Sequence, residues 1–235
     1  MPSAIPPAAA IFDMDGVLVN SNPFHVQKWI DLLKQRNIPF DTAAVPRQIL
    51  GMHNDDAFRR YFGSSMTHEG MRQLGAELEA QFREMFRPYA KPLPGLMALL
   101  GELRSAGIPM AVASSAIRAN VEFVVDTLGI RPFFRRLVTG DDVKAHKPDP
   151  EIYLQAAAGL GVEPAECVAF EDSFPGIAAV KNAGMRCVAI ASTFPLDELR
   201  SKTRADMVVP GFEGLSLERL RELFVRVEAP VGGRN

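Results

Sequence analysis

The chain has 235 residues, of which 47% are hydrophobic and 23% are charged. At about 150 residues per domain, this length indicates one large domain or one domain that carries an insert. The 26 basic and 28 acidic residues give a net charge of −2, which argues against a basic surface for nucleic acid. No apolar run approaches the ~18 residues of a membrane span, and the first basic residue, Lys28, comes too late for a secretory signal. We therefore expect a cytoplasmic protein that acts neither on nucleic acid nor at a membrane.

The two cysteines indicate neither a metal site nor a disulfide. Cys167 and Cys187 lie in the short apolar runs CVAF and CVAI, without the spacing of metal ligands. We expect both to be buried, reduced thiols.

The first predicted element is a short buried strand. Residues 8–12 form an apolar run that stops at Asp13-Met14-Asp15-Gly16. An apolar run that ends at acidic residues and glycine is typical of a strand that leads into a functional loop.

Residues 22–94 have the pattern of helices. Apolar side chains recur at helical spacing along two stripes, namely Val26, Trp29, Ile30 and Leu33, and then Met71, Leu74, Leu78, Phe82 and Met85. Between these stripes, Asn54 followed by Asp55 and Asp56 indicates a helix start with Asn54 as its cap. Two prolines within residues 89–95 close this helical insert.

Beyond residue 95, short apolar strands alternate with helices. The predicted strands are 108–113, 137–139, 167–170, 187–190 and 207–209. The predicted helices are 96–106, 117–128, one after Pro150, 173–184 and one from Leu215. This alternation predicts an α/β fold with a Rossmann-like, doubly wound parallel sheet and helices on both faces. We expect residues 1–21 and 95–235 to form this core and residues 22–94 to form an α-helical insert.

Chemically reactive side chains follow four of the predicted strands. In such a sheet the ligand binds at the carboxyl ends of the strands. Those ends carry Asp13, Asp15, Ser114, Lys147, Glu171 and Asp172. Asp13 and Asp15 can face one side while Met14 points away, and with Asp172 they offer the hard oxygen ligands that suit Mg²⁺. A divalent cation and Lys147 would balance the mutual repulsion of the acids.

Two lysines, Lys144 and Lys147, compete for this role in the loop after residues 137–139. Lys147 precedes Pro148, and a residue before proline favours an extended backbone. An extended backbone would aim the ammonium group into the site, so we interpret Lys147 as the functional lysine.

Four ordered motifs resemble those of the haloacid dehalogenase superfamily. They are Asp13-Met14-Asp15-Gly16-Val17-Leu18, Ser114 after an apolar strand, Lys147-Pro148-Asp149-Pro150, and Phe170-Glu171-Asp172-Ser173. The helical insert between the first two motifs resembles the cap of the β-phosphoglucomutase-like and phosphatase subfamily. The resemblance covers residues 8–210.

The resemblance implies covalent catalysis. Asp13 would be the nucleophile that forms an aspartyl-phosphate. Asp15 would be the general acid toward the leaving oxygen and then the base that activates water. Ser114 and the backbone N–H of Ser115 would hold phosphoryl oxygens, and Lys147 would neutralise charge on the phosphoryl group.

The resemblance also implies a Mg²⁺ site. Asp172, with Glu171 beside it, would bind the metal together with the Asp13 carboxylate and the Asp15 backbone carbonyl. Two roles stay open for Glu171, that of a direct ligand and that of a residue that supports the ligands.

Three residues of the predicted cap are candidate substrate contacts. His25 lies twelve residues after the nucleophile. In the phosphomutase branch a histidine at this spacing helps control the acid/base aspartate, and the alternative is a border residue beside the first apolar stripe. Gly51 and His53 belong to a loop that we expect to face the site, where His53 would touch the substrate. We expect His68 and His146 at the surface.

An insert between Asp13 and Ser114 implies hinges near residues 20–24 and 90–94. We expect the cap to open for substrate and to close against water. A monomer is compatible with the sequence.

Within the superfamily that this chain resembles, the dehalogenase and phosphonate-cleaving branches generally lack an acid at the position of Asp15. The presence of Asp15 therefore favours phosphate esters as substrates, because a leaving alkoxide needs a proton. A β-phosphoglucomutase holds a second phosphate with an arginine of the cap loop, where this chain has His53 and Asn54. The lysine-rich stretch of its last cap helix is replaced here by residues 78–82, LEAQF. These differences favour a Mg²⁺-dependent phosphatase that acts on a small phosphorylated metabolite, such as a sugar phosphate. The alternatives are a β-phosphoglucomutase-like mutase with the same nucleophile and, from another class, a catalytically silent binding protein.

Overall fold

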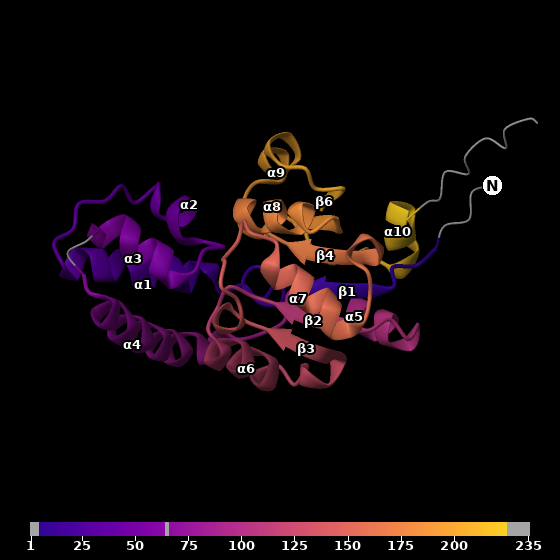
Figure 1. Cartoon of the computed structure of the whole chain (residues 1–235), viewed down its shortest axis with the longest axis horizontal. Coiled ribbons are helices and arrows are strands. Elements are labelled where there is room, and N and C mark those ends of the chain that lie inside the picture. Colours follow the sequence, from indigo (N-terminus) through magenta and orange to yellow (C-terminus); the bar gives the residue numbers. More distant parts are fainter. Residues whose placement is uncertain (1–4, 64–65, 225–235) are drawn as a thin grey trace, which may run out of the picture.

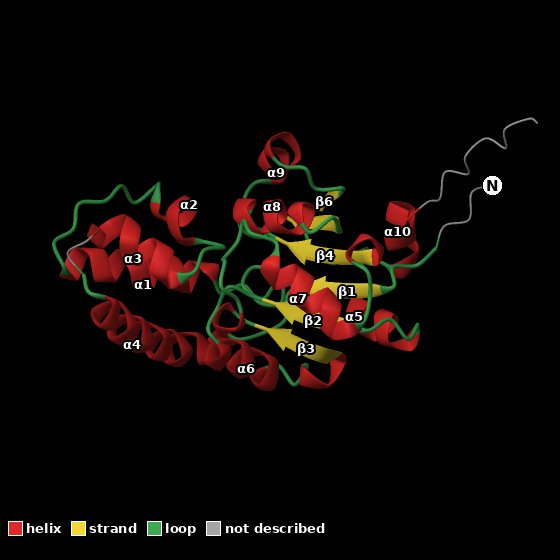
Figure 2. Ribbon diagram, in the orientation of Figure 1, coloured by secondary structure: helices red, strands yellow, loops and turns green. Residues whose placement is uncertain are grey.

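The computed structural model describes residues 5–63 and 66–224. Their strands form one six-stranded sheet in the order β3-β2-β1-β4-β5-β6, and each neighbouring pair is parallel (Figure 1; Figure 2). The strands are β1 (Ala9–Phe12), β2 (Met110–Ala113), β3 (Phe134–Val138), β4 (Cys167–Glu171), β5 (Arg186–Ile190) and β6 (Met207–Val209). This sheet confirms the predicted Rossmann-like α/β fold.

Two apolar layers hold helices against the two faces of the sheet. Because successive side chains of a strand point to opposite faces, Ala10 and Phe12 of β1 pack in one layer, and Ala9 and Ile11 pack in the other. The first layer includes side chains of α5 (Leu96–Ser105), α6 (Arg118–Thr127) and α10 (Leu217–Arg221). The second includes side chains of α7 (Glu151–Leu160), α8 (Phe174–Asn182) and α9 (Leu196–Lys202). All of β1 is buried, so the loop that follows it leaves the middle of the sheet.

The segment between β1 and α5 is helical. It contains α1 (Asn22–Gln35), α2 (Val45–Ile49), α3 (Asn54–Phe62) and α4 (His68–Phe86). In Figure 1 the strand arrows point toward these helices, which lie beyond the carboxyl ends of the strands. The helices bury an apolar cluster of their own around Trp29, Leu33 and Phe58. The last turns of α4 join the sheet core through Phe82 and Phe86.

The two connections between these helices and the sheet run side by side. Val19 pairs with Pro92 in an antiparallel bridge, and the Leu93 N–H donates a hydrogen bond of 3.0 Å to the Leu18 carbonyl. This pairing lies at the ends of the expected cap, but the domain bounds stay a prediction. Residues 1–4 and 225–235 of the predicted core, and 64–65 of the predicted cap, lie outside the described part of the chain.

Three helix details differ from the sequence prediction. Met85 is exposed, and Phe86, one position later on the same turn, is buried in its place. Asn54 is not the cap of α3, because the imidazole of His53 accepts the backbone N–H that a cap residue would accept. The helix α9 was not predicted, because it has seven residues and buries Leu199 as its core contact, too little for a periodic pattern.

Both cysteine thiols are free and buried, as predicted. Of the helices in residues 5–63 and 66–224, none is long and apolar enough to cross a membrane.

Candidate active site

The loop after β1 places two carboxylates beyond the centre of the sheet. The backbone N–H of Asp13 still bonds to the Phe170 carbonyl of β4, at 3.0 Å, while the side chain of Met14 is fully buried. The loop then turns at Gly16, whose φ of +80° lies in the left-handed region. A Cβ at Gly16 would overlap the carboxylate of Asp172. Glycine therefore lets this loop approach the end of β4.

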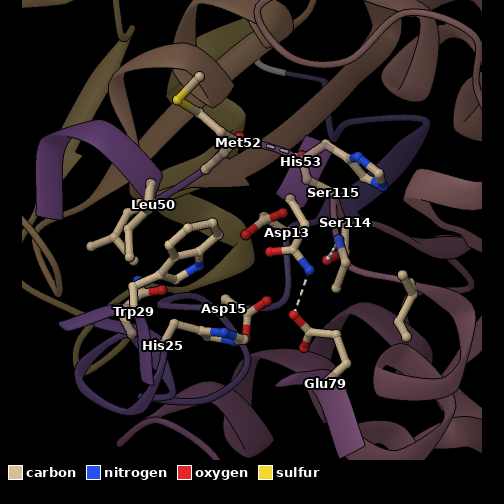
Figure 3. A pocket seen from close by; sticks show the side chains of 16 residues that line it. Asp13, Asp15, His25, Trp29, Leu50, Met52, His53, Glu79, Ser114 and Ser115 are labelled. Carbon is tan, nitrogen blue, oxygen red and sulfur yellow. Dashed lines mark hydrogen bonds and ion pairs between the residues drawn. The ribbon is translucent and has the colours of Figure 1, made fainter. Parts of the chain in front are cut away.

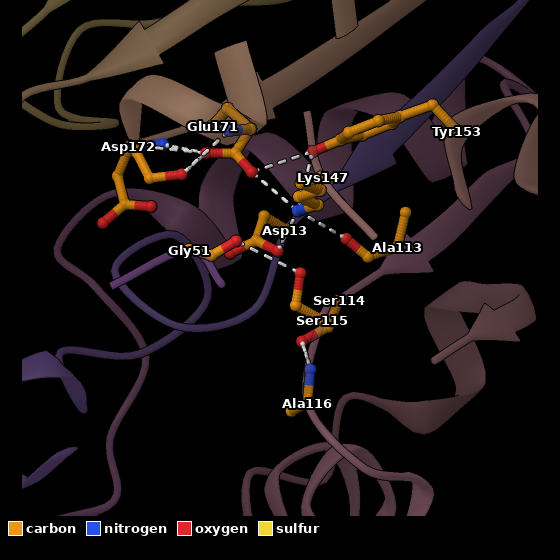
Figure 4. A network of polar contacts seen from close by, with 12 residues as sticks. Asp13, Gly51, Ala113, Ser114, Ser115, Ala116, Lys147, Tyr153, Glu171 and Asp172 are labelled. Atoms are coloured by element: carbon orange, nitrogen blue, oxygen red, sulfur yellow. Dashed lines mark hydrogen bonds and ion pairs between the residues drawn. The ribbon is translucent and has the colours of Figure 1, made fainter. Parts of the chain in front are cut away.

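Lys147 is the centre of the buried polar contacts (Figure 4). Its Nζ lies 2.7 Å from Asp13 Oδ1 and 2.6 Å from Glu171 Oε1. It also donates to the Tyr153 hydroxyl at 3.2 Å and to the Ala113 carbonyl at 3.3 Å. The structure thus brings the lysine of the third motif to the acids of the first and fourth. The peptide bond from Lys147 to the following proline is cis.

Glu171 uses both carboxylate oxygens within the protein. Oε1 accepts from Lys147 and from the Tyr153 hydroxyl, the latter at 3.1 Å. Oε2 accepts from the backbone N–H groups of Asp172 and Ser173, at 2.8 and 2.9 Å, and from the Ser173 hydroxyl. A Cβ at Gly176 would overlap this carboxylate, so glycine in the first turn of α8 makes room for it. These contacts favour the supporting role over direct metal binding.

The acidic group has a chemistry that fits Mg²⁺. Asp13, Glu171 and Asp172 each offer an oxygen, and these oxygens lie within 4.8 Å of one another. Burial raises the pKa of Asp13 to about 8, since it outweighs the opposing attraction of Lys147. Burial and the neighbouring Glu171 likewise raise the pKa of Asp172 well above its usual value. Carboxylates that repel one another in a buried site, with hard oxygen donors, suit a divalent cation.

Lys147 stays charged in this group. Burial lowers the pKa of its ammonium group, but the attraction of Asp13 and Glu171 is stronger and raises the pKa above its usual value. One cation is too few for all three acids to be ionised together, so a bound metal would favour their carboxylate forms.

Asp172 has two further partners that the sequence did not reveal. Its Oδ2 accepts from the Asn22 amide at 2.9 Å and from the Thr193 hydroxyl. The same two partners also bond to each other. Asn22 begins α1 and Thr193 follows β5, so residues distant in sequence orient one carboxylate.

Asp15 faces the helical segment rather than the acidic group. Its Oδ1 accepts from the Ser21 hydroxyl and lies 3.3 Å from His25 Nε2. The imidazole of His25 stacks on the Phe82 ring, with 3.9 Å between centroids. His25 therefore contacts the predicted acid/base residue. This contact agrees with the interpretation that His25 helps control that aspartate. The metal contact predicted for the Asp15 backbone carbonyl stays a prediction.

Ser114 and Ser115 line the pocket at the end of β2. The Ser114 hydroxyl accepts the backbone N–H of Ala116 at 3.1 Å, while the Ser115 hydroxyl donates to the Gly51 carbonyl at 3.3 Å. Gly51 has a φ of +78°, and a Cβ there would overlap Ser173. This glycine therefore lets the loop before α3 close over the strand ends.

One pocket contains both carboxylates of the first motif (Figure 3). Its lining includes Asp13, Asp15, Asn22, His25, Trp29, Ile49, Leu50, Gly51, Met52, His53, Asn54, Glu79, Ser114, Ser115, Ala116 and Ile117. The helical segment and the sheet therefore share the walls of the site.

His53 reaches the pocket, where it contacts His146, a residue that we expected at the surface. The ring stacks on His146 at 4.1 Å between centroids and 5° between planes. His146 is thus half-buried and not a surface residue, because the loop before α3 covers it. His68 is exposed, as predicted.

Sequence reasoning missed Tyr153, Ser21, Thr193 and Glu79. Tyr153 lies on the helix after Pro150, where helical spacing can indicate burial but not what a hydroxyl contacts. A serine shortly after the first motif and an acid beside an apolar helix stripe were the available signals for Ser21 and Glu79. Thr193 carries no comparable signal.

Comparisons with known proteins identify the family. Residues 7–184 match the model of haloacid dehalogenase-like hydrolases. The chain is 34% identical to the validoxylamine A 7′-phosphate phosphatase of Streptomyces hygroscopicus subsp. limoneus, over 81% of this chain and 88% of that protein. It is 32% identical to the β-phosphoglucomutase of Bacillus subtilis (strain 168), over 91% and 94% of the two chains.

Solved structures agree with the sequence relatives. The crystal structure of β-phosphoglucomutase from Clostridium difficile matches with a TM-score of 0.82 at 27% identity, covering 92% of this chain and 96% of that one. The family match spans all four motifs, from the loop after β1 to α8. The chain therefore belongs to the haloacid dehalogenase-like hydrolases.

Proposed function

We propose that this chain is a cytoplasmic, Mg²⁺-dependent phosphatase that hydrolyses a small phosphate monoester, such as a sugar phosphate. The observation that carries the proposal is the pair of carboxylates, Asp13 and Asp15, that line one pocket in different surroundings. Asp13 is bonded to Lys147, and Asp15 lies beside His25. Two acids with different partners can take two roles, nucleophile and proton donor. The phosphatase among the relatives supports the same reaction.

In the proposed first step, a carboxylate oxygen of Asp13 attacks phosphorus. The bond from phosphorus to the alcohol oxygen breaks, and Asp15 gives its proton to that oxygen. Lys147, 2.7 Å from Asp13, offsets the negative charge that the transferred group brings. Ser114 and the backbone N–H of Ser115 hold phosphoryl oxygens.

In the proposed second step, Asp15 accepts a proton from water while the water oxygen attacks phosphorus. The bond from phosphorus to Asp13 breaks, which releases inorganic phosphate and restores both carboxyl groups to their starting states. Asp13, Asp172 and the Asp15 backbone carbonyl would hold Mg²⁺. Glu171, which bonds to Lys147, would support these ligands. When bound, the metal supplies positive charge toward the phosphate oxygens.

Phosphate release from a panel of phosphate monoesters, with and without Mg²⁺, tests the proposal. We expect metal-dependent release by the wild-type chain and loss of at least ~10³-fold in Asp13→Asn. Asp197→Asn is the matched control, because the Asp197 side chain is 97% exposed. Equal activity in Asp13→Asn and the wild type would exclude the covalent mechanism.

A second candidate function is a phosphomutase of the β-phosphoglucomutase type. The relative from Bacillus subtilis, which aligns over 91% of this chain, favours it. A mutase would interconvert β-glucose 1-phosphate and glucose 6-phosphate when a bisphosphate primer is added. Interconversion without net phosphate release would support the mutase over the phosphatase. A chain that binds esters but turns none over would support the silent binding protein.

A further inference from the structure

Glu79 is a buried acid in the wall of the candidate active site. It comes from α4, and its side chain is 5% exposed. Figure 3 shows Glu79 around the same pocket as Asp13 and Asp15. Neither of the two proposed reaction steps uses this carboxylate. The role of this buried charge is therefore separate from the two proposed steps.

Three donors hold the Glu79 carboxylate in place. Lys28 Nζ and the Asn54 amide donate to Oε1 at 2.7 and 2.6 Å. The Asn120 amide donates to Oε2 at 2.5 Å, and Asn120 in turn accepts from Arg83. Burial alone would raise the pKa of Glu79, but Lys28 and these hydrogen bonds lower it to about 2. The carboxylate is therefore ionised at any physiological pH.

The cation that pairs with Glu79 lies behind the wall. The Lys28 side chain is 1% exposed. Its Nζ also lies 3.4 Å from His25 Nδ1 and 5.5 Å from the centre of the Phe82 ring. Lys28 is not among the residues that line the pocket, whereas Glu79 is. A ligand in the pocket thus meets the carboxylate before it meets the ammonium group.

The described residues of this wall include two imidazoles, His25 and His53, which contact Asp15 and His146. Among the described residues that line the pocket, none is lysine or arginine. The helical segment contributes Trp29, Leu50 and Met52 as apolar surface, and Asn54 as a polar amide. Such a surface suits hydroxyl groups and carbon faces.

We propose that Glu79 makes this site select phosphate monoesters whose alcohol part is neutral or carries an ammonium group, and reject those with a second phosphate or a carboxylate. The inference rests on the proposed phosphatase function and names its substrate class. Like charges repel, and because Lys28 lies behind Glu79 and outside the pocket lining, an anionic ligand group lies nearer to the carboxylate than to its paired ammonium group. An ammonium group is attracted to the same carboxylate.

A charge series on one carbon skeleton tests the inference. The probes are glucose 6-phosphate, glucosamine 6-phosphate, 6-phosphogluconate and glucose 1,6-bisphosphate. For the wild-type chain we expect kcat/KM for the first two to exceed that for the last two by at least ~10-fold. For Glu79→Gln we expect this ratio to fall below ~3-fold, because the loss of the carboxylate leaves the Lys28 charge unbalanced.

Glu77→Gln is the matched control, because Glu77 lies on the same helix and is exposed. The control removes one negative charge from α4 and should keep the wild-type ratio. Equal ratios in Glu79→Gln and Glu77→Gln would overturn the inference, as would a wild-type chain that accepts the bisphosphate as well as glucose 6-phosphate. If Glu79→Gln does not fold, Asn54→Arg keeps Glu79 but adds a cation to the wall, and should raise relative kcat/KM for the bisphosphate. An unchanged ratio in Asn54→Arg would then overturn it.

Calorimetry separates failure of the inference from failure of the proposed function. Binding of the four probes is measured on Asp13→Asn, with and without Glu79→Gln, so that no turnover is required. A wild-type chain that hydrolyses no ester, while the Kd values still follow the charge series, would reject the phosphatase and keep the charge selection. Hydrolysis of esters with no charge dependence in kcat/KM or Kd would reject the charge selection and keep the phosphatase.

Discussion

The guanidinium group of Arg47 in α2 donates two hydrogen bonds to the Glu198 carboxylate in α9, at 2.6 and 2.9 Å. The same group lies 5.9 Å from the centre of the Phe174 ring and 5.6 Å from that of Phe194. The helix α2 belongs to the expected cap, and α9 belongs to the sheet core. The contact therefore joins the two parts beside the site, and its loss should favour an open cap.

We predict that Arg47→Ala opens the molecule and weakens substrate use. The radius of gyration from small-angle scattering without ligand should increase, and kcat/KM should fall by about two- to fivefold, the effect of a single exposed pair. Arg60→Ala, which removes an exposed arginine of α3, is the control. An Arg47→Ala profile that superposes on both the wild type and the control would argue against this contact as a closure element.

Glu171→Gln should destabilise the protein even without metal. The carboxylate accepts five hydrogen bonds from its surroundings, and an amide group replaces one acceptor with a donor. Unsatisfied buried groups cost about 1–3 kcal/mol each, so the melting temperature in a chelator should fall by about 2–12 °C. Thermal unfolding followed by circular dichroism measures this.

The comparison for this prediction is Asp172→Asn. If Asp172 is a metal ligand and Glu171 supports the ligands, Asp172→Asn should chiefly abolish the stabilisation that added Mg²⁺ gives. Glu171→Gln should lower the melting temperature in the chelator as well. A Glu171→Gln variant as stable as the wild type in the chelator would favour direct metal binding by Glu171.

The alternation of short apolar runs with helical stripes was enough to predict the sheet and its covering helices other than α9. The same logic placed Asp13, Ser114, Lys147 and Asp172 at one edge, because the carboxyl ends of parallel strands meet there. The structure brings these residues together, while their catalytic roles stay predictions. The part of the site that could be predicted was therefore the set of residues that follow the strands directly.

The missed partners share a physical reason. Thr193 and Asn22 meet Asp172 across 21 and 150 positions of sequence, and a pattern within one element carries no record of such contacts. Glu79 is buried beside the predicted apolar stripe of α4. An acid at such a position was a signal of function, but its partners Lys28 and Asn120 come from other helices.

The stacked pair His53 and His146 predicts sensitivity to acid. Burial, and then the neighbouring His146, lower the pKa of His53 below its usual value, against the opposing pull of Asp55, Asp56 and Asp141. As pH falls below about 6.5, the usual histidine pKa, the unfolded chain takes up this proton before the folded chain does. The contribution of His53 to stability is thus complete above that pH and is lost as the pH decreases.

We predict that the melting temperature of His53→Asn falls less than that of the wild type between pH 7 and pH 5. Asparagine removes the titrating group and is itself a favourable N-cap residue for α3. His68→Asn is the control, because His68 is exposed on the neighbouring helix. Parallel pH profiles for the wild type and His53→Asn would show that this pair does not control the acid response.

Lys147→Met should abolish most of the activity, because it removes the cation bonded to Asp13 and Glu171 while keeping a stem of similar length. Loss of a charge that stabilises the transferred phosphoryl group costs about 10²–10³ in kcat. Lys144→Met tests the competing lysine of the same loop, whose side chain is exposed, and should keep kcat near the wild-type value. Steady-state phosphate release with saturating ester and Mg²⁺ measures kcat for both variants. A smaller loss in Lys147→Met than in Lys144→Met would reverse the assignment, and the buried position of Lys147 among three carboxylates argues against that result.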